Sequence, residues 1–289
     1  MKLGVSGFAW TANFEERHLS LLPGICAMGF TGFEVPMFDP AALPAAAIRR
    51  AFEANGLECT LCSILPAGIN PISPEPAVRQ RSRDHLVRCI ETATEMGAYL
   101  LGGPLFAPIG YLPGHRPTND EWCWAIELFQ SVGELLEAND ITLSIEPVNR
   151  SETFFLRTAV EAGKLCTAIA NPRIGVTIDT FHANIEEKNI PAAIESLGAQ
   201  LKHIHLSEND RGLLGAGHVD FPAILRSLQR IEYSGYLMIE GFGYLPSEPS
   251  APGALWADPA VPPDMMAQRG ISYLKAQKRF MLDTVIRHS

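Results

Sequence analysis

The chain has 289 residues and a formal net charge of −9 at pH 7, and 47% of its residues are hydrophobic against 19% charged. This balance excludes a disordered chain, which would have fewer apolar and more charged residues. With 23 basic against 32 acidic residues, the chain also lacks the clustered lysine and arginine that a general nucleic-acid-binding surface needs.

Short aliphatic and β-branched runs alternate along the chain with amphipathic segments. The runs predict strands over residues 2–9, 30–37, 57–65, 99–105, 141–148, 174–181, 201–207 and 236–242. The amphipathic segments predict helices over residues 14–29, 41–55, 76–96, 118–139, 158–169, 191–198, 221–232 and 265–286. Strand alternating with helix eight times indicates a parallel sheet covered by helices.

The size of the repeating unit favours a closed barrel over an open sheet. Eight units in this chain average about 36 residues each, which is the size of a βα unit. We therefore predict a single (β/α)8 TIM barrel over residues 1–289, with an open doubly wound sheet as the alternative. The segment 244–264 is rich in proline, glycine and serine and is predicted to be a long loop rather than a domain boundary.

The N-terminal residues 1–5 lack the charged and long apolar regions of a signal peptide. No stretch reaches the roughly 18 uninterrupted apolar residues of a membrane span. Six cysteines are too few for a disulfide scaffold. Cys59 and Cys62 form a C-x-x-C motif within an apolar run, where packing is favoured over redox or zinc chemistry. We expect a cytoplasmic protein with no membrane partner.

The last four predicted strands alternate aliphatic with polar residues. In a barrel strand one parity faces the helices and the other faces the interior. The aliphatic parity suits the helices, which leaves one ionisable residue facing inward near the carboxyl end of each strand. These residues are Glu146, Asp179, His205 and Glu240. Barrel enzymes build their active sites at this end.

Three carboxylates and one imidazole at one rim predict a metal site. Neighbouring strands lie about 4.8 Å apart, so the four side chains can converge. Unpaired, the buried carboxylates would be very costly, and the donor set suits Mn²⁺, Mg²⁺ or Co²⁺ better than a cysteine-rich zinc site. The alternative is a carboxylate network held by Arg, Lys and backbone donors. His203 shares the inward parity at a deeper level and is predicted to be a satisfied interior histidine.

Other side chains at this rim are candidates for holding a substrate. Glu152, His182 and Arg211 follow the strands and together suit the hydroxyl groups of a polyol. Glu34, on the second strand, points inward and is expected either to support the metal site or to contact substrate.

Aromatic residues share the inward parity at the first and last strands. These are Phe8, Trp10 and Phe242. They are expected either to fill the core or to stack on the apolar face of a sugar.

A metal flanked by two carboxylates indicates proton transfer beside a carbonyl group. A metal that chelates a ketone oxygen and the neighbouring hydroxyl acidifies the C–H on the hydroxyl-bearing carbon and stabilises the enediolate. Glu146 and Glu240 come from different points of the arc, so they can flank a sugar on opposite faces. One would remove the proton and the other would return it on the far side, inverting that carbon.

The residues also resemble a known family. The motifs are Glu146-Pro-Val-Asn-Arg-Ser-Glu152, Asp179-Thr-Phe-His182-Ala-Asn-Ile-Glu-Glu187, His205-Leu-Ser-Glu-Asn-Asp-Arg211-Gly and Glu240-Gly-Phe242. They resemble the D-tagatose/D-psicose (allulose) 3-epimerase family of the xylose-isomerase-like (β/α)8 barrels, over nearly the whole chain. The wider superfamily shares the metal residues, whereas their combination with the flanking polar residues is more specific.

The resemblance implies an isomerase that inverts C3 of a free ketohexose or ketopentose, of the D-tagatose, D-fructose/D-psicose or L-ribulose type, through a cis-enediolate. It implies that Mn²⁺ or Co²⁺ is bound by Glu146, Asp179, His205 and Glu240, of which Glu146 and Glu240 form the acid/base pair. It also implies that the first three sugar oxygens are held by Glu152, His182 and Arg211, with Phe242 lining the pocket. Members are commonly dimers or tetramers, so a homo-oligomer is expected.

Other functions remain as alternatives. An aldose–ketose isomerase of the same barrel type, such as a hydroxypyruvate isomerase, would use the same metal and bases but move the proton between C1 and C2. A DNA-repair endonuclease on this barrel would need a multi-zinc cluster and a basic face, which 8 histidines and a charge of −9 disfavour. The intact metal set disfavours a non-catalytic sugar-binding barrel.

Overall fold

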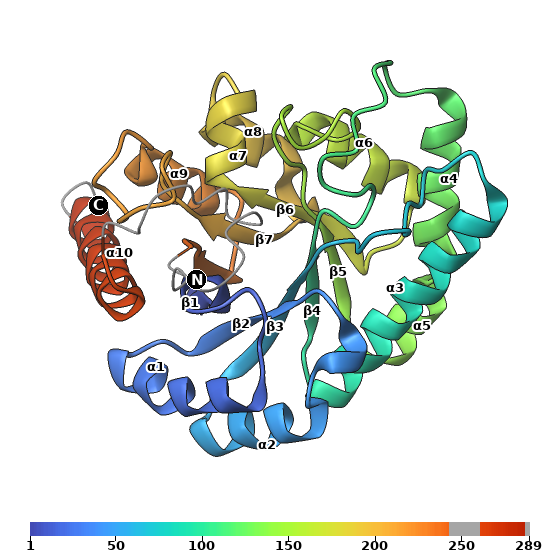
Figure 1. Ribbon diagram of the computed structural model, residues 1–289. Coiled ribbons are helices and arrows are strands. Elements are labelled where there is room, and N and C mark those ends of the chain that lie inside the picture. The colour runs from blue at the N-terminus through green and yellow to red at the C-terminus, as the bar shows by residue number, and fades with distance from the viewer. Residues whose placement is uncertain (243–260, 287–289) are drawn as a thin grey trace.

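The computed structural model describes residues 1–242 and 261–286, with side chains described as far as residue 277. Within these ranges, parallel strands β1 to β8 pair in chain order and close into a barrel (Figure 1). The strands are β1 Lys2–Ser6, β2 Gly32–Met37, β3 Glu58–Ser63, β4 Leu100–Gly103, β5 Thr142–Ile145, β6 Ile174–Asp179, β7 Leu201–Leu206 and β8 Tyr236–Ile239. The predicted (β/α)8 barrel is confirmed.

Helices form the outer layer of the barrel (Figure 1). They are α1 Leu22–Met28, α2 Ala45–Asn55, α3 Pro76–Met96, α4 Asn119–Gln130, α5 Gly133–Ala138, α6 Ala159–Ile169, α7 Thr180–Glu186, α8 Ile190–Leu197, α9 Phe221–Arg230 and α10 Pro263–Ile286. The last of them, α10, contacts both α1 and β8 and so closes the ring. Most of the loop predicted over 244–264 lies outside the described residues. Among the described helices, none combines the length and apolar character needed to cross a bilayer.

Two predicted helices are each divided in the structure. The segment 14–29 begins as a 3-10 helix, Glu16–Leu21, before α1. Pro23 has no backbone N–H to donate to the preceding turn, so one continuous α-helix cannot form there. The segment 118–139 is α4 followed by α5, with a break at residues 131–132. The break brings Gly133 so close to Asn171 that a Cβ would lie 2.6 Å from the amide nitrogen.

Helix α7 was not predicted, because the strand predicted over 174–181 extended across its start. In the structure β6 ends at Asp179, and the Asp179 side chain accepts a hydrogen bond of 2.8 Å from the Phe181 N–H. An aspartate in this role caps a helix N-terminus. The helix that follows carries His182 over the carboxyl ends of the strands.

The buried layers agree with the predicted parities. The Thr177 hydroxyl donates a hydrogen bond of 2.6 Å to Ser144 between neighbouring strands inside the barrel. The aliphatic residues of opposite parity, such as Leu143 and Ile178, belong to the main hydrophobic core. Alternation along each strand therefore separates an apolar outer core from a polar interior.

Gly103, the last residue of β4, lies against Ser63 at the end of β3. Its φ is +125°, and a Cβ would lie 2.0 Å from the backbone oxygen of Ser63. We expect Gly103→Ala to destabilise the fold by about 2 kcal/mol or more, lowering the thermal midpoint by roughly 4–8 °C. Gly68→Ala is the control, because Gly68 also has a positive φ of +81° but nothing within 4 Å of its Cβ position. Equal midpoints for the two variants would contradict this expectation.

Candidate active site

An open pocket lies at the carboxyl ends of the barrel strands, with about 510 Å³ of empty space when the solvent at its mouth is included. Its lining residues are Phe8, Phe38, Cys62, Ile64, Pro104, Ile109, Glu146, Val148, Glu152, His182, Arg211, Glu240 and Phe242. In TIM barrels this end carries the active site.

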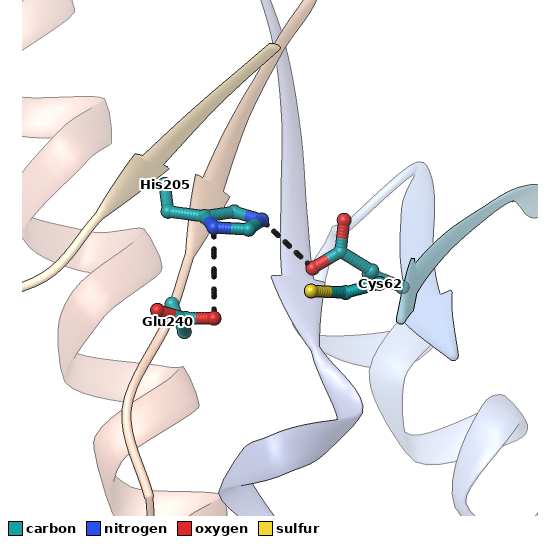
Figure 2. A group of neighbouring side chains, drawn as sticks. Cys62, His205 and Glu240 are labelled. Atoms are coloured by element: carbon teal, nitrogen blue, oxygen red, sulfur yellow. Dashed lines mark ion pairs between the residues drawn. The ribbon is translucent and has the colours of Figure 1, made fainter. Parts of the chain in front are cut away.

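All four predicted metal ligands are buried, and two of them, Glu146 and Glu240, line this pocket. His205 Nδ1 is 3.3 Å from Glu146 Oε1 and 3.5 Å from Glu240 Oε1. Figure 2 shows the imidazole of His205 above Glu240, with Cys62 beyond its other edge. Arg211 links Asp179 to Glu240. Its Nη1 donates a hydrogen bond of 2.7 Å to Asp179 Oδ2 and another to Glu240 Oε2. Because the donor atoms come from the ends of β5 to β8, closure of the barrel brings them together.

Arg211 is the main positive charge among these carboxylates. Its guanidinium carbon lies 4.0 Å from the ring centre of Phe181 and 4.7 Å from that of Phe242, so the two rings hold it from either side. Burial alone would lower the pKa of Arg211, but Asp179 and Glu240 raise it, so the guanidinium stays charged. Arg211 therefore joins two predicted ligands to the polar wall of the pocket.

The charge balance of the site fits a cation. Arg211 contacts Asp179 directly, yet burial and the neighbouring Glu240 still raise the pKa of Asp179 above its usual value. Burial would lower the pKa of His205, but Glu34, Glu240 and Glu146 raise it well above its usual value. Arg211 and His205 together therefore bring at most two positive charges to four buried carboxylates, those of Glu34, Glu146, Asp179 and Glu240. Carboxylate oxygens and an imidazole nitrogen are donors that a divalent ion such as Mn²⁺, Mg²⁺ or Co²⁺ accepts, and such an ion would supply the missing charge.

The potential donor atoms lie in two adjacent groups. Their members are Glu146, Asp179 and His182 in one group, and Glu34, Cys62, His205 and Glu240 in the other. From the sequence, both cysteines of the C-x-x-C motif were predicted to pack in the core. In the structure Cys59 belongs to the outer core, whereas Cys62, of opposite parity on β3, faces the barrel interior. Burial and the nearby carboxylates raise the pKa of the Cys62 thiol well above its usual value. As a neutral thiol it is a poor ligand for a hard cation.

Glu34 is fully buried outside the pocket lining and contacts two histidines. Its Oε2 is 3.0 Å from His203 Nε2, and its Oε1 is 2.9 Å from His205 Nε2. Burial would raise the pKa of Glu34, but His205 and His203 hold it well below its usual range. His203 is thus a paired interior histidine, and Glu34 faces the side of His205 opposite to Glu146. This arrangement points His205 Nδ1 at the predicted metal site.

Because Glu34 holds His205 in this orientation, Glu34→Gln should weaken divalent-metal binding by about 10–100-fold. The dissociation constant for Mn²⁺ is measured by titration calorimetry on protein freed of metal by chelation. Glu58→Gln is the control, since Glu58 is exposed and pairs with Lys2 on the surface. Equal Mn²⁺ affinity in the Glu34 variant and the control would contradict a supporting role for Glu34.

The predicted aromatic residues separate into two groups. Phe8 and Phe242 line the pocket and pack against each other with ring centres 5.1 Å apart. Trp10 lies away from the described pocket lining: its ring packs on Phe33, and its Nε1–H donates a hydrogen bond of 2.8 Å to Asp264 of α10. Strand parity could not tell Phe8 from Trp10, because both follow β1 in a 3-10 turn where the alternation of a strand does not apply.

The polar wall consists of Glu152, His182 and Arg211, and the structure brings all three predicted residues to it. Arg211 Nη2 is 3.3 Å from His182 Nε2. Burial lowers the pKa of His182 to about 3, so its imidazole is neutral at physiological pH. Sequence analysis missed Asn149, which is buried between Glu152 and His182 and bonds to both. The sequence did hold a signal for Asn149, since it lies between Glu146 and Glu152 in the motif that contains both predicted site residues.

Comparison with known proteins agrees with the fold. A family model described as the xylose isomerase-like TIM barrel matches residues 25–277. A probable ketose 3-epimerase of Synechocystis sp. is 29% identical, over 95% of this chain and 96% of its own. A ketose 3-epimerase of Arthrobacter globiformis is 30% identical over 84% of each chain.

Solved structures extend the comparison to three dimensions. The structure of an L-ribulose 3-epimerase superposes with a TM-score of 0.92 at 27% identity, covering 100% of this chain and 98% of that one. The chain therefore belongs to the xylose isomerase-like TIM barrel family, and these three relatives are ketose or L-ribulose 3-epimerases, which are isomerases.

Proposed function

We propose that this protein is a metal-dependent ketose 3-epimerase that inverts C3 of a free ketohexose or ketopentose. One observation carries the proposal: the carboxylates of Glu146 and Glu240 both line one pocket and both approach the same nitrogen of His205, at 3.3 and 3.5 Å. Two bases and a candidate metal site in one small cavity are what a two-base inversion requires. The ketose 3-epimerases among the relatives support it.

In this proposal the metal is held by Glu146, Asp179, His205 and Glu240. A bound divalent ion, Mn²⁺ or Co²⁺ with Mg²⁺ as a further candidate, would stabilise the negative charge that forms when a C–H beside a ketone loses its proton. One of the two glutamates takes the proton from C3, which leaves that carbon planar. The other glutamate, now acting as an acid, returns a proton to the opposite face, and the configuration at C3 is inverted.

The pocket wall favours an unphosphorylated sugar. Glu152, His182 and Arg211 would hold the oxygens near C3, and Phe8 and Phe242 would cover the apolar face of the sugar. Arg211 is the only Lys or Arg in the described lining, and its guanidinium already contacts two carboxylates. A phosphate would find no unpaired basic side chain among these residues.

The test is the position of the exchanged proton. Purified protein with Mn²⁺ is incubated with D-fructose, D-tagatose or L-ribulose in D₂O, and the products are identified by NMR. We expect C3 epimers that carry deuterium at C3. Aldoses labelled at C2 would instead support the hydroxypyruvate-isomerase-like alternative, and aldoses as the only products would contradict the proposal.

We also propose that the protein forms a homodimer or homotetramer. Light scattering coupled to size-exclusion chromatography measures the molar mass, for which the monomer value is 31.5 kDa. A monomer at the concentrations used for the activity assay would contradict this.

A further inference from the structure

Asn149 is a buried side chain that the proposed chemistry does not use directly. It is 3% exposed and lies beyond the end of β5, between Glu146 and Glu152. Its Oδ1 accepts a hydrogen bond of 2.9 Å from the Ser151 N–H. Because that contact fixes the oxygen, the amide nitrogen must face the other way, where it donates to Glu152 Oε1 at 2.7 Å and approaches His182 Nδ1 at 2.9 Å.

The same nitrogen of His182 faces a second donor. The backbone N–H of Asn149 lies 3.2 Å from His182 Nδ1, so the side-chain amide and the main chain both point hydrogens at it. A ring nitrogen between two donors must be an acceptor, and a neutral imidazole then carries its proton on the other nitrogen. That nitrogen, Nε2, lies 3.6 Å from Asp179 Oδ2, which can accept its hydrogen, and 3.3 Å from Arg211 Nη2, which can only donate. Nδ1 faces two close donors and Nε2 faces one donor and a nearer carboxylate, so the proton is better placed on Nε2.

We propose that Asn149 is a positioning residue that sets the hydrogen-bond polarity of the pocket wall, holding His182 as an Nε2–H donor and Glu152 as an acceptor. The geometry is held from outside the pocket as well. The next residue, Arg150, binds Glu186 of α7 through both its backbone N–H and its guanidinium, at 2.8 Å in each case. The segment after β5 and the helix that carries His182 are thus joined, which preserves the contacts of Asn149.

This polarity defines the substrate chemistry that the wall accepts, and this step rests on the proposed function. His182 and Arg211 offer hydrogens to an oxygen that accepts, such as a ketone oxygen. Glu152, as a carboxylate, takes a hydrogen from a neighbouring hydroxyl group. Asn149 therefore helps the pocket wall to bind an α-hydroxyketone. Exchanging the donor and acceptor roles of His182 and Glu152 should impair binding of that group.

The substitution Asn149→Asp tests this inference because it keeps the side-chain shape and the acceptor for Ser151. It replaces the donor by a carboxylate oxygen that faces both Glu152 and His182 Nδ1. We expect kcat/KM for ketose epimerisation to fall by about 10–100-fold, with the thermal midpoint within a few degrees of wild type. A kcat/KM near that of wild type would overturn the inference.

The matched control is Asn171→Asp. Asn171 forms the same local turn, with its Oδ1 accepting from the Arg173 N–H at 2.8 Å, but it precedes β6 at the end of the barrel opposite the pocket. Its activity should equal that of wild type. An equal loss of activity in both variants would show that aspartate in this type of turn is harmful by itself and would overturn the specific role of Asn149.

The histidine tautomer is measured without substrate. Nitrogen-15 NMR of histidine-labelled protein in Mg²⁺, which is diamagnetic, is expected to show His182 with a bare Nδ1 and a protonated Nε2; the signal is assigned by its loss in His182→Gln. Asn149→Ala leaves only the backbone N–H facing Nδ1, so the share of His182 protonated at Nε2 should fall, and Asn149→Asp, which puts an acceptor there, should lower it further. A wild-type His182 protonated at Nδ1 would overturn the inference. The absence of ketose epimerisation would contradict the proposed function but leave this spectrum unaffected, so the two failures are distinguishable.

Discussion

Glu240→Gln should lower the rate of C3 epimerisation by about 10³-fold or more while the barrel stays folded. The glutamine keeps the size of the side chain and can still accept a hydrogen bond from Arg211, but it cannot take or return a proton. It also removes one carboxylate from the predicted metal set, so the assay is run at saturating Mn²⁺. The measured quantity is kcat for interconversion of a ketose and its C3 epimer. Turnover near the wild-type rate would contradict the two-base mechanism.

The two-base mechanism also predicts which epimer each glutamate can deprotonate by itself. With Glu240 disabled, Glu146 should still exchange the C3 proton of one epimer with D₂O without inverting it, and Glu146→Gln should show the opposite preference. Glu195→Gln serves as the control, because Glu195 pairs with Arg230 on the surface and neither residue lines the pocket. Exchange of both epimers by either variant would contradict the assignment of one base to each face.

Removing divalent metal with EDTA should abolish epimerisation, and Mn²⁺ or Co²⁺ should restore it. The physical reason is the buried carboxylate group of the predicted metal site, in which the pKa of Asp179 stays raised by burial and by Glu240 in spite of Arg211. Metal binding should also raise the thermal midpoint in a concentration-dependent way, since a ligand that binds only the folded state stabilises it. An enzyme that is indifferent to EDTA would contradict the metal site.

Acid should weaken the same site. Burial would lower the pKa of His205, but Glu34, Glu240 and Glu146 raise it well above its usual value, and the pKa of Asp179 is raised as well. Metal ligands must be deprotonated, so protons compete with the ion more strongly as the pH falls through these raised values. The apparent dissociation constant for Mn²⁺ should therefore increase between pH 8 and pH 5, and extra Mn²⁺ should recover part of the lost activity.

The predicted elements agree best with the structure where the hydrophobic pattern was not opposed by proline or by a helix-capping side chain. Hydrophobic alternation identified the strands, and the inward parity of β5 to β8 selected Glu146, Asp179, His205 and Glu240, which lie together in the structure. The errors arose where a local signal was overridden. Pro23 divided a segment of helical periodicity, and the side chain of Asp179 ended β6 early by capping α7.

The sequence by itself determined the fold class, the end of the barrel that carries the site and the identity of the ionisable residues there, because alternation, βα spacing and motif order are properties of the chain in one dimension. Only the tertiary structure decided which of those residues share a contact. Glu34 pairs with His203 and His205 across 169 and 171 residues of chain, Trp10 leaves the pocket for Asp264, and Asn149 joins Glu152 to His182. Such contacts depend on barrel closure and on the direction of each side chain, which side-chain parity along a single strand does not specify.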